Sequence, residues 1–238
     1  MSRTAAFDVL SLVRSDLRDL AAYEPVEPAD VRAEQLGLAE ADLLKLDGTE
    51  NPFGPSPRAV EAIARERAYH LYPDPSQTRL RERLAGVVGA SPERIVAGAG
   101  SDELIDLLLR AIVAPGDGVV ECPPTFGMYA FLARVAGARL LEAPRRADFS
   151  LDIDAVTAKA GTAKIVFLAS PNNPTGNVTP REDIRRLLDL GALVVVDEAY
   201  AEFAGESVVD LTAERENLVV LRTFSKWAGL AGLRIGYG

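Results

Sequence analysis

The chain has 238 residues, 48% of them hydrophobic, and carries 26 Lys and Arg against 35 Asp and Glu, for a formal net charge of -9. This length and apolar content predict a globular chain with a sizeable core, and the acidic balance argues against general binding to nucleic acid or to anionic membranes. The single cysteine, Cys122, excludes an intrachain disulfide, and together with the single histidine, His70, it leaves too few ligands for an ordinary zinc site, so we expect no metal.

An N-terminal arm is expected over residues 1–55. Apolar residues recur there at helical spacing, at Leu10, Val13, Leu17 and Leu20. This spacing predicts an amphipathic helix, and Pro25 and Pro28 then favour an extended segment. The sequence has no apolar core of a secretion signal and no apolar run as long as a membrane-spanning helix, so we expect a soluble, cytoplasmic protein.

From residue 56 to 238 the pattern predicts one α/β domain. Helical patterns cover residues 57–69, 78–88, 101–112, 126–136, 153–160 and 181–190, and strand patterns cover 95–97, 119–121, 139–141, 165–168, 193–196 and 218–221. Because several strands are apolar on both faces, we expect a mainly parallel sheet with helices on both faces. Ligands of such sheets bind beyond the carboxyl ends of the strands, so the loops that follow the strands are the candidate site.

The first two such loops have features of a binding site. Gly98 and Gly100 precede a predicted helix whose first backbone amides, at Ser101 and Asp102, could bind an anion, although an ordinary helix cap is the alternative. Phe126 follows the proline-rich loop after the next strand, where it could stack on a flat ring or belong to the core.

The next two loops carry polar groups directly after buried strands. Asn172 and Asn173 lie between prolines, where an amide could hydrogen-bond an anionic ring oxygen, and a plain turn is the alternative. Asp197 ends an apolar strand and requires a partner, because an unpaired buried charge is costly. A protonated ring nitrogen would serve, as would a structural arginine or a helix cap, and Tyr200 could reach the edge of the same ring.

The last loop contains Lys226, in the string Thr-Phe-Ser-Lys at residues 223–226. Small and apolar residues surround it and Arg234 follows eight residues later, which is typical of an amine that forms a Schiff base, although a surface lysine is the alternative. An anion cradle, a stacking ring, an amide, a carboxylate, a phenol and a lysine on successive loops fit one ligand, pyridoxal 5′-phosphate.

The motifs at residues 170–176, 195–200 and 223–226 with Arg234 resemble those of the fold-type I pyridoxal-phosphate-dependent aminotransferases of class I and II. Within that family, residues 46–55, 71–75, 98–103 and 124–129 are similar to the histidinol-phosphate aminotransferases. The resemblance runs from about residue 44 to the end of the chain.

The resemblance implies a role for each site residue. Lys226 would bind the cofactor covalently and move the substrate Cα proton, with Asp197 on the pyridine nitrogen. The other implied cofactor contacts are Asn173 and Tyr200 to the phenolate oxygen, Phe126 stacked on the ring, and Ser101, Asp102, Ser225, Arg234 and Tyr72 to the phosphate. Tyr72 would come from the neighbouring subunit of a homodimer, and Asn51 would lie on the substrate side.

The implied reaction is transfer of the amino group between L-histidinol phosphate, a small-molecule amino donor, and the 2-oxo acid 2-oxoglutarate, as in histidine biosynthesis. An amino-acid-phosphate decarboxylase and an aromatic or broad-specificity aminotransferase remain alternatives within the same fold. The resemblance implies that relatives continue past the position of Gly238 into a C-terminal small domain that binds the substrate carboxylate, so we expect this sequence to be either a fragment of a longer chain or a truncated form. An inactive cofactor-binding module is therefore a further alternative, and a sheet that ended just after Tyr237 would leave an unpaired edge.

Overall fold

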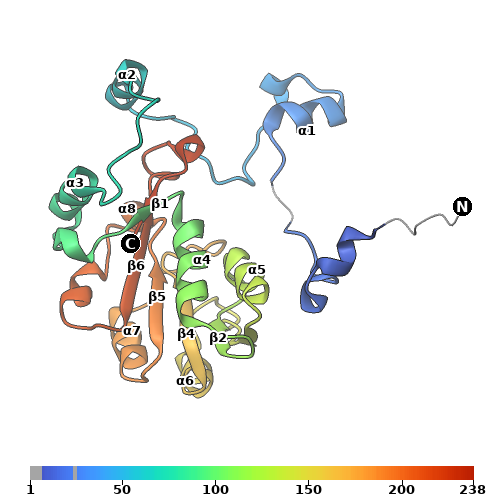
Figure 1. Cartoon of the computed structure of the whole chain (residues 1–238), viewed down its shortest axis with the longest axis vertical. Coiled ribbons are helices and arrows are strands. Elements are labelled where there is room, and N and C mark those ends of the chain that lie inside the picture. The colour runs from blue at the N-terminus through green and yellow to red at the C-terminus, as the bar shows by residue number, and fades with distance from the viewer. Residues whose placement is uncertain (1–6, 24–25) are drawn as a thin grey trace, which may run out of the picture.

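The computed structural model describes residues 7–23 and 26–238, and it consists of an α/β body from which the N-terminal segment extends (Figure 1). The strands are β1 Ala97–Gly98, β2 Gly118–Glu121, β3 Arg139–Glu142, β4 Ala163–Ala169, β5 Leu193–Asp197, β6 Leu218–Thr223 and β7 Gly236–Tyr237. They form one sheet in the order β1-β7-β6-β5-β4-β2-β3. Strands β2 to β6 pair in parallel, and β7 runs antiparallel to both β6 and β1. The expected mainly parallel sheet is confirmed.

Most of the predicted helices form. The helices are α1 Ala29–Leu36, α2 Pro57–Arg65, α3 Thr78–Val88, α4 Ser101–Ile112, α5 Met128–Val135, α6 Ile153–Ala160, α7 Arg181–Leu188 and α8 Ala201–Ala204. Short 3-10 helices lie at Val9–Leu12, Ser15–Leu17, Glu40–Asp42, Pro92–Arg94, Val209–Ala213 and Ala231–Leu233. Helices α3, α4 and α6 begin and end where the sequence predicts. None of the helices in the described ranges has the length and apolar character needed to cross a membrane.

The two faces of the sheet bury alternate residues of each strand. On β5, Val194 and Val196 pack with α6 and α7, whereas Val195 packs with α4 and α5. Successive side chains of a strand point to opposite faces, which explains why the central strands are apolar throughout. The same alternation separates the two carboxylates that end the strand, because Asp197 contacts Tyr129 on α5 while Glu198 contacts Ser207 on the other side.

The prediction of an amphipathic helix near the N-terminus is wrong. Residues 9–17 form two short 3-10 helices, and the side chains of Leu10 and Leu12 are 66% and 72% exposed. An isolated helix of this length is marginal without a surface to bury its apolar face, and the Asp8 side chain instead accepts a local hydrogen bond from the Leu10 backbone. Pro25 lies outside the described residues. Helix α1, which the sequence analysis did not predict, begins directly after Pro28 and ends at Gly37 in the left-handed conformation.

The prediction of an unpaired sheet edge at Tyr237 is also wrong. Strand β7 lies inside the sheet between β6 and β1, with Tyr237 opposite Arg222 on one side and Ala97 on the other. Gly238 extends the pairing through two backbone hydrogen bonds with Val96. The sequence pattern did not reveal this arrangement because β1 and β7 have two residues each, too few to show a period.

Candidate active site

A cavity of about 290 Å³ lies at the carboxyl ends of β4, β5 and β6, where Ala169, Asp197 and Thr223 line it. Nine of the residues predicted from the sequence also line it: Ser101, Asp102, Phe126, Asn173, Asp197, Tyr200, Ser225, Lys226 and Arg234. Because parallel strands end at one edge of the sheet, loops that are far apart in the sequence meet there. The cavity is therefore the candidate active site.

Asp197 is the buried charge of this cavity, with 4% of its surface exposed. Its Oδ2 accepts a hydrogen bond of 2.7 Å from the Tyr129 hydroxyl, and its Oδ1 accepts one of 3.1 Å from the backbone N–H of Ala199. No Lys or Arg of the described ranges forms an ion pair with it. Burial raises the pKa of Asp197 to about 6, although both hydrogen bonds oppose that rise. The structural arginine that the sequence left open as a partner is absent from the described residues, so the carboxylate is available to a cationic ligand group.

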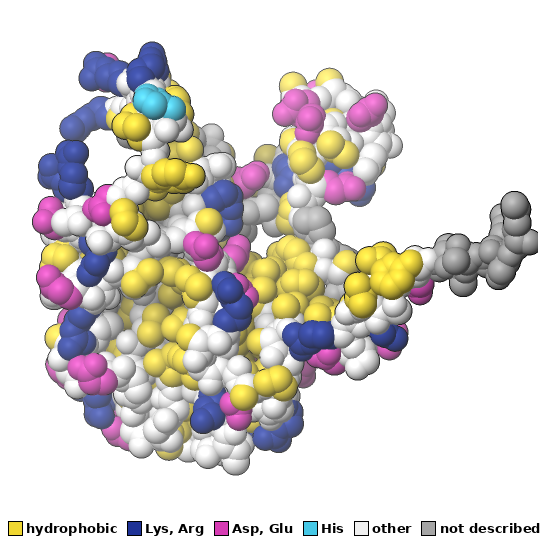
Figure 2. All heavy atoms as spheres, in the orientation of Figure 1, with side chains coloured by type: hydrophobic (Ala, Val, Ile, Leu, Met, Phe, Trp, Pro, Cys, Tyr) yellow, Lys and Arg dark blue, Asp and Glu magenta, His cyan; other side chains and the backbone are white. Residues whose placement is uncertain are grey.

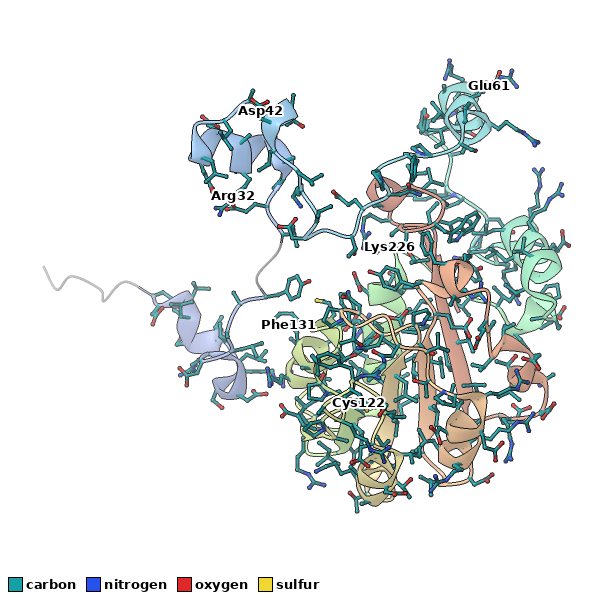
Figure 3. The ribbon with its side chains drawn as sticks, turned by 180° about the vertical axis from the view of Figure 1, so that it is seen from behind. Arg32, Asp42, Glu61, Cys122, Phe131 and Lys226 are labelled. Carbon is teal, nitrogen blue, oxygen red and sulfur yellow. The ribbon has the colours of Figure 1, made fainter. Side chains whose placement is uncertain are left out.

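Lys226 approaches the cavity from the loop after β6, at the place where the N-terminal segment passes the body (Figure 3). Its Nζ donates hydrogen bonds to the backbone oxygen of Gly48 at 3.2 Å and to Thr49 Oγ1 at 2.9 Å. It also lies 5.7 Å from the centre of the Tyr200 ring, within the range of a cation–π contact. The amine is thus held in the cavity by a segment about 180 residues away in the sequence.

The opposite part of the cavity has the features of an anion site. Helix α4 begins at Ser101, so its first backbone amides are directed at the cavity, and Arg234 lies opposite with its Nη2 3.3 Å from Asp102 Oδ2. Glycine suits position 100, because its φ of +84° strains any residue with a side chain, and a Cβ would also force Arg234 Nη2, 2.8 Å away, to shift. Ser225 is buried nearby, and its Oγ accepts a hydrogen bond from the Thr223 hydroxyl.

The two adjacent amides of the loop after β4, Asn172 and Asn173, differ in surroundings. Asn172 is 2% exposed and is fully used, because it accepts a hydrogen bond from Thr125 and donates to Pro124 and Thr175. Asn173 lines the cavity, and its side chain makes no hydrogen bond to the residues that the structure describes. The first amide therefore fixes the loop and leaves the second one free for a ligand.

Two predicted site residues lie outside the cavity lining. The Asn51 side chain donates to the backbone oxygens of Lys226 and Trp227, so it positions the backbone of the lysine, and its place on the substrate side stays a prediction. Tyr72 has a fully exposed side chain, and its assignment to the site of a neighbouring subunit also stays a prediction.

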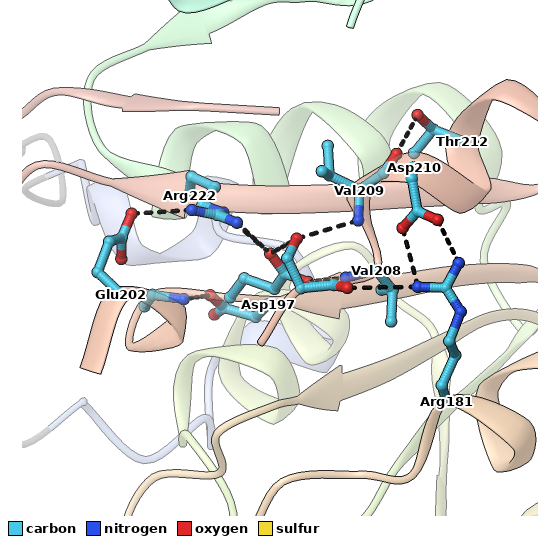
Figure 4. Close-up of polar contacts among 11 residues, drawn as sticks. Arg181, Asp197, Glu202, Val208, Val209, Asp210, Thr212 and Arg222 are labelled. Carbon is cyan, nitrogen blue, oxygen red and sulfur yellow. Dashed lines mark hydrogen bonds and ion pairs between the residues drawn. The ribbon is translucent and has the colours of Figure 1, made fainter. Parts of the chain in front are cut away.

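Behind the cavity, a buried ion cluster joins the ends of β5 and β6 (Figure 4). Arg222 is bonded to Glu198 at 2.8 Å and to Glu202 at 2.9 Å. Glu198 also accepts hydrogen bonds from Ser207 and from the Val208 backbone, and burial raises its pKa while these partners lower it. The cluster holds the loop after α8 against the strands that carry Asp197.

Thr49 and Tyr129 also line the cavity, and neither was predicted as a site residue from the sequence. Tyr129 lies three residues after Phe126 at the start of α5, and this helical spacing could have placed both on one side of the helix. The backbone of Thr49 has a φ of +47°, a left-handed conformation that no residue pattern indicates for a β-branched side chain. The remaining polar group of interest, the Cys122 thiol, lies inside the body (Figure 3), where burial raises its pKa to about 12.

Comparison with known proteins identifies the family. The sequence profile of the aminotransferase class I and II family matches residues 41–238. The chain belongs to this family. It is similar to the histidinol-phosphate aminotransferase of Roseiflexus castenholzii, with 54% identity over 96% of this chain and 64% of that protein. It is also similar to the chloroplastic histidinol-phosphate aminotransferase 1 of Arabidopsis thaliana, with 48% identity over 96% of this chain and 55% of that protein.

The fold of this aminotransferase family chain agrees with a solved structure. The crystal structure of histidinol-phosphate aminotransferase from Sinorhizobium meliloti in complex with pyridoxal 5′-phosphate superposes with a TM-score of 0.83 at 30% identity, over 98% of this chain and 63% of that one. The chain thus spans less than two thirds of the length of these relatives.

The residues of the aminotransferase chain fit pyridoxal 5′-phosphate by their chemistry. A buried carboxylate without a cation, Asp197, suits a protonated pyridine nitrogen, and the α4 N-terminus with Arg234 suits a phosphate. Lys226 lies in the same cavity and supplies the amine that an aldehyde requires.

Proposed function

We propose that this chain forms the cofactor-binding part of a pyridoxal-phosphate-dependent aminotransferase that moves the amino group between L-histidinol phosphate and 2-oxoglutarate. The observation that carries the proposal is the joint placement of Lys226 and Asp197 in one cavity. The identities of 54% and 48% to proteins named histidinol-phosphate aminotransferase support the choice of substrate.

Each residue of the cavity has a separate task in this reaction. The bound cofactor would act as an electron sink for negative charge that develops at the substrate Cα. With the cofactor bound, Asp197 would keep its ring nitrogen protonated, and Asn173 and Tyr200 would hold its phenolate oxygen. Lys226 Nζ would supply the amine for its aldehyde group and would act as the base that holds and moves the proton of the substrate Cα.

The remaining cavity residues position the cofactor. Phe126, whose ring meets Tyr129 edge-on with centres 5.5 Å apart, would stack on the cofactor ring. Ser101, Asp102, Ser225 and Arg234 would hold its phosphate. Asn51 lies at the substrate side of Lys226, whose backbone it also holds.

We also propose a homodimer in which Tyr72 completes the phosphate site of the partner. Large apolar side chains on the segment before α3 are exposed, among them Leu44 at 81% and Phe53 at 94%, and Figure 2 shows apolar surface on the N-terminal segment as well. A contact with a second copy would bury this surface. Residues 1–55 are then an arm belonging to the small-domain side and 56–238 the large domain. The single cysteine is in keeping with a cytoplasmic protein.

Borohydride reduction tests the cofactor site. The purified chain is incubated with pyridoxal 5′-phosphate, reduced, digested and analysed by mass spectrometry, and we expect the adduct on Lys226. Before reduction, Lys226→Ala should lack the visible absorbance of the imine between cofactor and lysine, whereas the matched control Lys159→Ala should retain it. Labelling spread over several lysines with equal yield would contradict a specific site.

Substrate assays test the reaction. L-histidinol phosphate with 2-oxoglutarate should give glutamate in the dimeric protein, measured by coupled glutamate detection. An aromatic amino acid used at a higher kcat/KM would assign the chain to a broad-specificity aminotransferase, and release of CO2 from an amino-acid phosphate would assign it to a decarboxylase. Cofactor binding without any turnover would leave the chain a cofactor-binding module.

A further inference from the structure

Tyr129 is the largest fully buried side chain in the described residues, and its hydroxyl reaches the acidic residue of the cavity. The ring stacks on Phe167 with centres 5.0 Å apart and planes within 3°, and it meets Phe126 edge-on. A phenylalanine would make the same ring contacts. What the tyrosine adds is one O–H group, carried by the start of α5, which donates to Asp197 Oδ2 at 2.7 Å.

We propose that Tyr129 is a positioning residue for the active site: its hydroxyl holds the Asp197 carboxylate in one orientation and in its ionised form, so that the carboxylate can bind the cofactor ring nitrogen. The proposal rests on the proposed function for the ring nitrogen, whereas the hydrogen bond itself is independent of any cofactor.

Two donors share the task of stabilising this buried charge. Ala199 N–H binds Oδ1 and the Tyr129 hydroxyl binds Oδ2, so each oxygen has one further lone pair without a hydrogen bond in the described structure. The tyrosine bond is the shorter of the two, as expected for an O–H donor to a carboxylate. It also fixes the plane of the carboxylate, because a side chain held at both oxygens cannot rotate.

The groups around Asp197 explain why it needs these donors. Burial is the largest influence and raises its pKa to about 6, and the carboxylates of Asp102 on α4 and Glu198 after β5 raise it further. The Tyr129 hydroxyl and the Ala199 N–H oppose the rise. Across the cavity lie Tyr200, Lys226 and Arg234, none of them bonded to Asp197 in the described structure. Loss of the tyrosine hydroxyl would thus leave Asp197 protonated near neutral pH.

The sign of the effect on stability follows from the raised pKa. An unfolded aspartate titrates near 3.9, so ionisation of Asp197 costs folded-state stability as pH rises from about 4 to about 6. A charge-assisted hydrogen bond is worth about one to two pKa units, so Tyr129→Phe should extend this loss to about pH 7 to 8. The ratio of the unfolding equilibrium constant of the variant to that of the parent should be about ten- to a hundredfold larger at pH 8 than at pH 4.5.

The decisive experiment is a double-mutant cycle on the cofactor-free chain. Urea unfolding of the parent, Tyr129→Phe, Asp197→Asn and the double variant is measured between pH 4.5 and 8.5. We expect the loss in free energy of unfolding caused by Tyr129→Phe to grow with pH in the parent background and to be constant in the Asp197→Asn background. Comparison of the two backgrounds cancels the effects of other titrating groups. Tyr237→Phe is the matched control, since Tyr237 is also buried and lies two strands from β5, and its deficit should show no dependence on Asp197. A deficit of Tyr129→Phe that is the same at every pH would reduce the hydroxyl to a packing role and overturn the proposal.

Two further measurements separate this proposal from the proposed function. The 13C titration of the Asp197 carboxyl, assigned with Asp197→Asn, should give a pKa near 6 in the parent chain, and a value above about 7.5 would overturn the proposal even if Tyr129→Phe did not fold. Pyridoxal 5′-phosphate should bind Tyr129→Phe about three- to tenfold more weakly than the parent at pH 7, with the ratio approaching one at pH 8.5. A pH-dependent deficit in a parent chain that binds no cofactor would refute the proposed function and leave the Tyr129–Asp197 coupling in place.

Discussion

The hydroxyl of Thr49 lies 2.9 Å from Lys226 Nζ and 2.9 Å from the hydroxyl of Tyr200, so one side chain of the N-terminal segment joins the amine and the phenol of the cavity. Thr49 makes these contacts from a left-handed backbone with a φ of +47°, which is unfavourable for a β-branched residue. Backbone strain of this kind persists where the surroundings require it. The contact therefore indicates that the 47–50 segment belongs to the site.

Removal of the Thr49 hydroxyl should weaken attachment of the cofactor to Lys226. Thr49→Val retains the shape and loses the acceptor of the Lys226 hydrogen bond, worth about 0.5–1.5 kcal/mol, so we expect affinity for pyridoxal 5′-phosphate to fall about two- to tenfold. Absorbance titration measures it. Thr49→Ser is the control and should bind like the parent. Equal affinities of the Val and Ser variants would show that the hydroxyl has no part in the site.

A methyl group at Gly236 should disturb the anion site from behind. A Cβ there would lie 2.4 Å from both the Gly100 carbonyl carbon and the Ser101 nitrogen, so β7 and the start of α4 would have to separate. Gly236→Ala should cost at least about 2 kcal/mol in urea unfolding and also weaken phosphate-ester binding. A Cβ at Gly232 would meet nothing within 4 Å, so Gly232→Ala should stay within about 0.5 kcal/mol of the parent. A similar cost for both variants would contradict the close approach.

Removal of the Glu198 charge should unfold the region behind the cavity. Glu198 is 2% exposed and is one of two carboxylates paired with Arg222, so Glu198→Gln leaves a largely buried guanidinium with Glu202 as its remaining counter-ion. Breaking a fully buried pair from one side costs about 3–5 kcal/mol, and because Glu202 stays in place, thermal unfolding should show a loss towards the lower end of that range. The control is the exposed pair of Arg185 and Glu214 at 3.6 Å, where Glu214→Gln should cost less than about 1 kcal/mol. Comparable losses in the two variants would show that the cluster in Figure 4 does not contribute as a buried unit.

The sequence predicts the body of this protein well and the N-terminal segment poorly, for physical reasons. Strand β5 and helix α4 are recognisable because burial imposes a period on their side chains. Leu10 and Val13 show helical spacing as well, yet both are exposed in the described structure and no α-helix forms there.

The same contrast holds for the candidate site. Polar residues at strand ends, such as Asp197, can be predicted because the sheet gathers them at one edge. Thr49 reaches the cavity through a strained turn of a distant segment, and that depends on tertiary contacts that no local pattern encodes. Tyr129 could be placed near Phe126 by helical spacing, whereas its hydrogen bond to Asp197 depends on how α5 packs on the sheet.

Glu121 should make the stability of the chain depend on pH around neutrality. It is buried at the end of β2, opposite Glu142 on β3, and burial followed by the charge of Glu142 raises its pKa to about 7. A raised carboxyl pKa means that stability is full below the unfolded pKa and is lost as pH rises from about 4.5 to about 7. Glu121→Gln removes this loss, so the variant should gain about 1–3 kcal/mol relative to the parent between pH 5 and pH 8. Urea unfolding across this range measures the gain.

Glu206→Gln, at an exposed position, is the control and should follow the parent at every pH. A Glu121→Gln curve parallel to that of the parent would mean that the Glu121 carboxyl titrates below this range, and that the charge of Arg134, which lowers its pKa, outweighs the burial.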